Sequence, residues 1–108
     1  MERILCAAIW YKVDRKFNYQ PKNIDRGYVM CGRRHHNIIS LNFEITDNPT
    51  RRETSVQGFL TSTDRFVDRV EAGRIAKAAG QLIEIPTIGT TEKYEKPDGE
   101  ELISEELY

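Results

Sequence analysis

The segment GFLTSTDRFVDRVEAGRIA, residues 58–76, contains the strongest structural signals in the chain. Two runs with β-forming residues, 56–61 and 65–67, flank the short polar sequence Ser62-Thr63-Asp64. Short polar residues between two such runs favour a tight turn. The first half of the segment therefore predicts a β-hairpin.

The second half of the segment predicts a helix over about 69–79. Asp68 is a favourable N-cap residue, and Glu71 follows three residues later, as a capping box requires. Alanines and Ile75 then recur at helical spacing. Gly80 is a typical residue at a helix C-terminus. The chain is therefore expected to contain both strands and helices.

Two further strands and one ambiguous segment precede the hairpin. Residues 4–11 are apolar on both alternating sets, which is typical of a central strand covered on both faces. Residues 28–31 predict a second strand, ended by Gly32. Residues 37–46 alternate between apolar and polar side chains like a strand, yet their apolar residues also form a wide helical face. The residues alone leave this segment open between strand and helix.

Length and composition restrict the class of protein. The 108 residues suffice for one domain, 1–108, and are too few for two. The 16 basic and 17 acidic residues give a net charge of −1, whereas nucleic-acid binders usually carry a basic excess, so no duplex nucleic acid is expected as partner. We find neither a signal peptide nor the ~20 apolar residues of a membrane span, and expect no membrane association. Cys6 and Cys31 lie in apolar runs and are predicted to be buried thiols in a reducing cytoplasm.

Three arginines, Arg65, Arg69 and Arg74, surround the start of the predicted helix. A helix start already carries partial positive charge, so cations there are unfavourable unless an anion lies between them. Guanidinium groups bind phosphate through paired hydrogen bonds, and Phe59 and Phe66 are close enough in sequence to stack on a base. The alternative is that both rings belong to the core and the arginines pair with neighbouring acids.

A second candidate site is CGRRHHN, residues 31–37. Arginine and histidine side chains at a strand end suit an anionic ligand or general acid–base chemistry, while the alternative is a turn whose histidines cap the next element. Cys6, Cys31, His35 and His36 fit no standard zinc spacing, so no metal site is predicted. No nucleophile motif or phosphate-binding glycine loop is found, so we predict no catalytic residue and no cofactor.

Four segments together resemble a family of small phage and prophage proteins. They are ILCAAIWYK (4–12), CGRRHHNII (31–39), VQGFLTSTDRFVDRVEAGRIAKAAGQ (56–81) and LISEELY (102–108), which cover about half of the chain. The segment 56–81 is the most specific of the four. On these residues the chain is identified as a member of the first-described family of Thoeris anti-defence proteins.

The resemblance implies a binding protein rather than an enzyme. Members of that family sequester cyclic ADP-ribose isomers, the immune signals made by bacterial TIR enzymes, and some members also hold the cyclic trinucleotides of CBASS systems as hexamers. The resemblance implies an α+β fold, with two helices packed on an antiparallel sheet, assembled at least as a homodimer. It also implies a location in the cytoplasm of the infected host and favours a helix over 36–46.

Physical chemistry agrees with such a ligand. A cyclic ADP-ribose needs cations for its pyrophosphate, a flat group for its adenine and polar groups for its riboses. The residues predicted to bind it are Arg33, Arg34, Arg65 and Arg69 for the phosphates, Phe59 or Phe66 for the base, and His36, Asn37, Thr61 and Asp68 for the sugars. The stretch 44–55 is short for the family, which leaves the choice of ligand open.

Two other functions are retained as alternatives. One is an enzyme that degrades such a signal, with His35 or His36 as acid or base. The other is a phage factor that binds protein or nucleic acid and has no small ligand. Its contacts would come from the Arg51-Arg52 loop and from the acidic C-terminal segment.

Overall fold

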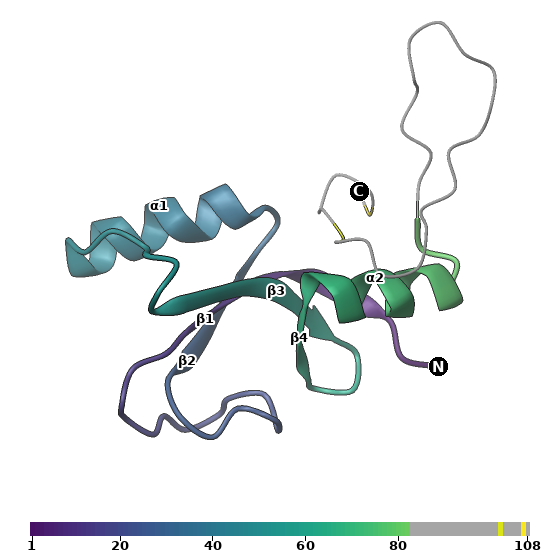
Figure 1. The fold of residues 1–108 in the computed structure, drawn as a ribbon, viewed down its shortest axis with the longest axis horizontal. Helices are drawn as coiled ribbons and strands as arrows, with labels where there is room; N and C mark the ends of the chain where they lie inside the picture. Colours follow the sequence, from purple (N-terminus) through teal and green to yellow (C-terminus); the bar gives the residue numbers. More distant parts are fainter. Residues whose placement is uncertain (83–101, 103–106, 108) are drawn as a thin grey trace, which may run out of the picture.

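In the part of the chain that the structure describes, four strands form one antiparallel sheet in the order β2-β1-β3-β4, and two helices pack on it (Figure 1). The elements are β1 Ile4–Tyr11, β2 Tyr28–Gly32, α1 His35–Thr46, β3 Ser55–Thr61, β4 Phe66–Asp68 and α2 Arg69–Ala78. The structure, a computed structural model, describes residues 1–82, 102 and 107. The predicted α+β fold, an antiparallel sheet with two helices, is confirmed.

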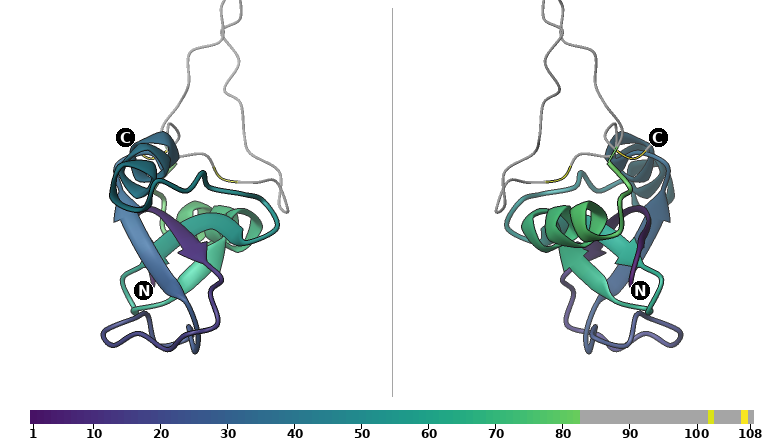
Figure 2. Two further views of the ribbon diagram at one scale, coloured as in Figure 1. Left: turned by 90° about the vertical axis from the view of Figure 1, so that its left-hand side faces the viewer. Right: turned by 90° about the vertical axis from the view of Figure 1, so that its right-hand side faces the viewer.

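Strand β1 is central, as predicted, because it pairs with β2 on one side and with β3 on the other. On the helix side of the sheet, Ala7, Ile9 and Tyr11 join the core together with Phe59 of β3. Helix α1 packs on β1 and β2, while α2 packs on β3, β4 and β1. Each helix therefore covers one end of the same face of the sheet (Figures 1 and 2).

The other face of the sheet is partly covered by the connection 12–27. The Trp10 indole N–H donates to the Arg26 carbonyl at 2.8 Å, and the ring contacts Phe66 edge-on at 6.3 Å. The Asn23 side-chain amide bonds both the N–H and the C=O of Phe66. The prediction that β1 is covered on both faces thus holds along most of the strand, whereas Leu5, beside a register shift, is 54% exposed.

Residues 37–46 lie in helix α1, so the strand suggested by their alternation is wrong and the helix implied by the resemblance is confirmed. The buried residues of α1 are His35, Ile38 and Asn42, which are spaced three and four residues apart. The alternating apolar side chains that mimicked a strand, at positions 41, 43 and 45, point to solvent instead.

The predicted hairpin and second helix are confirmed. The Thr61 N–H donates to the Arg65 carbonyl at 2.9 Å, and Asp64 closes the turn with a φ of 62°. The Asp68 carboxylate caps α2 by accepting the Glu71 backbone N–H at 2.8 Å. Gly80 then adopts the left-handed conformation, with a φ of 68°, directly after the helix.

The C-terminal segment reaches the core at the two positions that the structure describes. Leu102 is fully buried, and its N–H donates to the Arg69 carbonyl at 2.9 Å. Leu107 packs against the same core. Among residues 1–82, 102 and 107, no helix has the length and apolar character needed to cross a membrane.

The prediction that both cysteines are buried is wrong. Cys31 is exposed, because β2 is an edge strand, and Cys6 of β1 is only partly buried. Cys31 lies opposite Ala8, two residues along β1 from Cys6, so both thiols lie on the face that carries no helix. The two thiols share a hydrogen bond, which lowers the pKa of Cys6 to about 7 and raises that of Cys31.

Candidate functional site

The two helices begin near one another above the middle of the sheet and run toward opposite ends of it (Figure 1). His35 and Arg69, the first residues of α1 and α2, are in contact there, with His35 Nδ1 lying 3.4 Å from an Arg69 Nη2 atom. Each helix start contributes partial positive charge, part of which the Asp68 carboxylate offsets at α2. The middle of this face therefore favours an anion.

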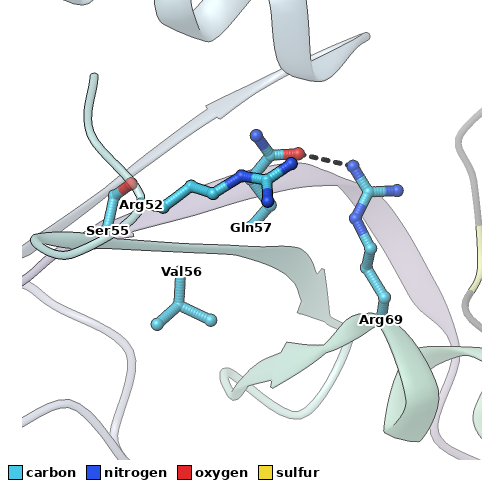
Figure 3. A pocket seen from close by; sticks show the side chains of 5 residues that line it. All are labelled: Arg52, Ser55, Val56, Gln57 and Arg69. Carbon is cyan, nitrogen blue, oxygen red and sulfur yellow. Dashed lines mark hydrogen bonds between the residues drawn. The ribbon is translucent and has the colours of Figure 1, made fainter. Parts of the chain in front are cut away.

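A cavity of about 480 Å³ opens beside these helix starts (Figure 3). Its lining includes Arg52, Ser55, Val56, Gln57 and Arg69. Figure 3 shows the Arg52, Gln57 and Arg69 side chains reaching toward one another above β3, while the Val56 side chain points away from them. The volume lies in the range of ~300–1,000 Å³ that is usual for small-molecule sites, and the two guanidinium groups suit phosphate oxygens.

The Arg69 guanidinium has a fixed direction because three acceptors hold it. It donates to Gln57 Oε1 at 2.5 Å, to the Leu102 carbonyl at 3.0 Å and to His35 Nδ1 at 3.4 Å. His35 in turn bonds the Gly58 carbonyl through Nε2 at 2.8 Å. Residues of α1, β3 and the C-terminal segment therefore orient the side chain of Arg69, which belongs to α2.

A smaller cavity of about 150 Å³ lies near the other end of α1. Tyr11 and Tyr28 stack at its edge with ring centroids 5.1 Å apart, and the Tyr28 hydroxyl donates to Asn42 at 3.3 Å. Its described lining carries hydroxyl, amide and apolar groups without a charged side chain. An anionic ligand is therefore expected in the larger cavity.

Arg65 and Thr61, both predicted as ligand contacts, are engaged by Glu2 instead. Arg65 Nε and Nη2 donate to the two Glu2 carboxylate oxygens at 2.9 and 2.7 Å, and the Thr61 hydroxyl donates to Glu2 at 2.7 Å. Thr63 adds a further hydrogen bond to the carboxylate. The Arg65 hydrogen bond, followed by those of the threonines, lowers the pKa of Glu2 to about 2.

The other charged residues around the start of α2 have separate roles. Arg74 is exposed and lies 3.6 Å from the Glu71 carboxylate, and Asp68 is used as the helix cap. Two of the three arginines that the sequence places here thus have acidic partners. Arg69 is the one that lines the cavity.

The two predicted base-stacking rings are buried. Phe59 lies in the core on the helix side, where His35 packs edge-on against it at 5.2 Å. Phe66 lies on the opposite face of the sheet, against Trp10. Neither ring is open to a ligand in this conformation, and the two are not brought together.

The predicted residues before and within the first turn of α1 lie close to the site without being part of the described cavity lining. Arg34 occupies the N-cap position, and its N–H donates to the Asn37 side chain at 3.2 Å. Arg33, His36 and Asn37 are exposed. They surround the helix start that supplies His35 to the site.

Three polar residues of the cavity lining were missed as ligand contacts by reasoning from the sequence: Arg52, Ser55 and Gln57. His35 was considered only within the segment 31–37 and as a possible acid or base, and its contact with Arg69 was not foreseen. One signal was available for Gln57. It alternates with Phe59 and Thr61 and therefore lies on the core side of β3, where a polar amide needs a partner. Arg52 was assigned only to a protein- or nucleic-acid-binding loop.

Comparison with known families identifies a match for this chain. A family model described as the phage T4 y16D protein matches residues 3–108, nearly the whole chain. The chain belongs to the phage T4 y16D protein family. No curated protein and no solved structure matches it. The family assignment places the chain among phage proteins.

The described residues of this y16D-family chain contain no group of three or more histidine, cysteine or acidic side chains arranged to hold a metal ion. The chemistry on the described part of the site is that of permanent cations and hydrogen-bonding amides. Such groups bind an anion by charge and geometry.

Proposed function

We propose that this phage protein binds a cyclic nucleotide immune signal, a cyclic ADP-ribose isomer or a related cyclic oligonucleotide, and sequesters it without cleavage in the cytoplasm of the infected bacterium. The observation that carries the proposal is the cavity beside the start of α2, with Arg52 and Arg69 in its lining (Figure 3). The resemblance of the four sequence segments to the Thoeris anti-defence family supports the choice of ligand.

The charges of the site suit a pyrophosphate. Arg52 and Arg69 supply two guanidinium groups on one side of β3. Arg52 can bond two phosphate oxygens at once, and Arg69 keeps N–H donors beyond its three contacts with Gln57, His35 and Leu102. Ser55 and Gln57 offer hydroxyl and amide groups suited to ribose hydroxyls. Sequestration requires that binding be tight relative to the concentration of the signal, so a dissociation constant near nanomolar is expected.

The groups at the site also support binding without turnover. Arginine stays protonated at any physiological pH and does not serve as a general base. His35 is buried, and both of its ring nitrogens face partners in the protein, Gly58 and Arg69. The ligand is therefore expected to be released unchanged.

We further propose that the chain assembles as a homodimer or larger homo-oligomer. Helix α1 exposes three large apolar side chains, Leu41 (47%), Phe43 (51%) and Ile45 (67%). Light scattering at increasing protein concentration measures the assembly. A monomer at every concentration, in wild type as in Ile45→Asp, contradicts this part of the proposal.

Calorimetric titration tests the ligand. The panel contains cyclic ADP-ribose isomers, cyclic di- and trinucleotides, ADP-ribose and NAD, and the bound compound is recovered by heat denaturation and identified by mass. Tight binding of a cyclic species, recovered intact, supports sequestration. A cleaved product indicates an enzyme, and absence of binding across the panel refutes the small-ligand function.

Two substitutions locate the ligand. Arg52→Ala removes an exposed side chain, and Arg69→Ala removes the held guanidinium; each is expected to weaken binding by about 2 kcal/mol, roughly 30-fold, the scale of a lost charge-assisted contact. Arg74→Ala is the matched control, because Arg74 is an exposed arginine paired with Glu71. If Arg52→Ala and Arg69→Ala bind the ligand as tightly as Arg74→Ala, the cavity is excluded as the phosphate site.

A further inference from the structure

We infer that His35 is a positioning residue that aims the Arg69 guanidinium into the cavity. His35 is 8% exposed, and its ring packs edge-on against Phe59 with the ring centroids 5.2 Å apart. Its effect on ligand affinity rests on the proposed function, whereas its effect on Arg69 is independent of any ligand. The inference concerns how the site is preorganised.

The hydrogen bonds determine which ring nitrogen faces Arg69. The Gly58 carbonyl only accepts hydrogen bonds, so Nε2, 2.8 Å away, carries the ring proton and donates to it. In the neutral ring Nδ1 then has a lone pair, and this lone pair faces Arg69 Nη2 at 3.4 Å. A backbone carbonyl of β3 thus selects the tautomer that can accept from Arg69.

This contact is one of three that orient the guanidinium, and each comes from a different part of the chain. Gln57 belongs to β3, Leu102 to the C-terminal segment and His35 to α1. A guanidinium has five N–H donors, so these three contacts within the described structure leave donors for an anion. Holding the side chain in place beforehand reduces the conformational entropy lost when the ligand binds.

The position of His35 in the fold makes it more than a packing residue. It is the first residue of α1 and joins that helix start to β3 and to the start of α2. The aromatic contact with Phe59 keeps the ring in one orientation. Removing only the nitrogens should therefore release Arg69 while leaving the apolar packing largely intact.

Substitutions at position 35 separate the two roles. His35→Phe keeps a ring against Phe59 and removes both nitrogens, while His35→Asn restores an oxygen near the position of Nδ1. Ser40→Ala, at an exposed position of α1 with no part in the site, is the control. For the wild type we expect nitrogen-15 NMR of the side chains to show the Nε2–H tautomer of His35 and slowed rotation of the Arg69 guanidinium. We expect His35→Phe to lose this slow rotation and His35→Asn to recover it.

Titration with cyclic ADP-ribose then measures the consequence for binding. His35→Phe is expected to weaken binding about tenfold, and to cause no further loss when Arg69 is already alanine, since the two residues act as one unit. Equal losses in both backgrounds indicate a general structural role and overturn the inference. Unchanged Arg69 rotation in His35→Phe also overturns it, whether or not a ligand binds. Normal affinity of Arg52→Ala and Arg69→Ala refutes the proposed function alone.

Discussion

Replacing Gly58 with alanine is expected to disrupt the sheet at the point where it supports the site. A Cβ atom on Gly58 would lie 2.0 Å from the Val67 carbonyl oxygen, 2.8 Å from Phe66 Cζ and 3.0 Å from the Val67 carbonyl carbon. Ordinary contacts of a Cβ atom begin at 3.4 Å. Because the nearest atoms belong to the backbone of β4, the β3–β4 hairpin must open by more than an ångström.

The loss of folding stability expected for Gly58→Ala follows from the kind of atom that is displaced. Overpacking in a core costs about 1–3 kcal/mol when side chains can adjust, and a clash with backbone belongs at the upper end. A small domain loses about 4–8 °C of melting temperature per kcal/mol. Gly58→Ala should therefore melt at least ~12 °C below the wild type. The displaced Gly58 carbonyl also holds His35, so ligand affinity should fall as well.

Thermal unfolding followed by circular dichroism tests this prediction, with Gly80→Ala as the matched control. Among the described residues, a Cβ atom on Gly80 meets no atom within 4 Å, and the φ of 68° is what makes the substitution unfavourable. That conformation costs an alanine about 1–2 kcal/mol. If Gly58→Ala melts as high as Gly80→Ala, the steric argument for position 58 is refuted.

Two further predictions concern titratable groups. Because the pKa of Glu2 is lowered to about 2, its hydrogen-bonded ion pair with Arg65 stabilises the fold fully above pH ~4.5, and this stabilisation is lost as the pH falls toward 2. Glu2→Gln should therefore lower the melting temperature at pH 7. A difference in melting temperature between Glu2→Gln and the wild type that persists undiminished at pH 2 contradicts this prediction. Alkylation of Cys6 by iodoacetamide should be half-maximal near pH 7, because the Cys31 thiol bonds its thiolate. Cys31→Ala should shift that profile to higher pH, and an unchanged profile would show that the thiol pair does not set the reactivity.

The hairpin and α2 were predictable because their signals are local. A turn depends on a few neighbouring residues, and the Asp68 cap bonds an N–H only three positions away. The family resemblance, rather than the residue pattern, identified α1 correctly. Its alternation is equally compatible with a strand, and the packing of Ile38 and Asn42 on the sheet settles the helix.

The site residues were predictable only in part. Arg69 was identified as a candidate because its position at a helix start is visible in the sequence. Arg65 lies in the same local context, yet its partner is Glu2, 63 residues away, which no local pattern indicates. The partners of Arg69 are likewise distant, at positions 35, 57 and 102.

The sequence by itself thus determined the hairpin, the second helix and the presence of several arginines at that helix start. Only the tertiary structure decided which arginine lines a cavity and which side chains hold it. The physical reason is the separation along the sequence of the residues whose contacts decide each feature. Turn and cap hydrogen bonds join residues within about four positions, whereas the surroundings of Arg69 depend on strand register, on the packing of α1 and on the docking of Leu102.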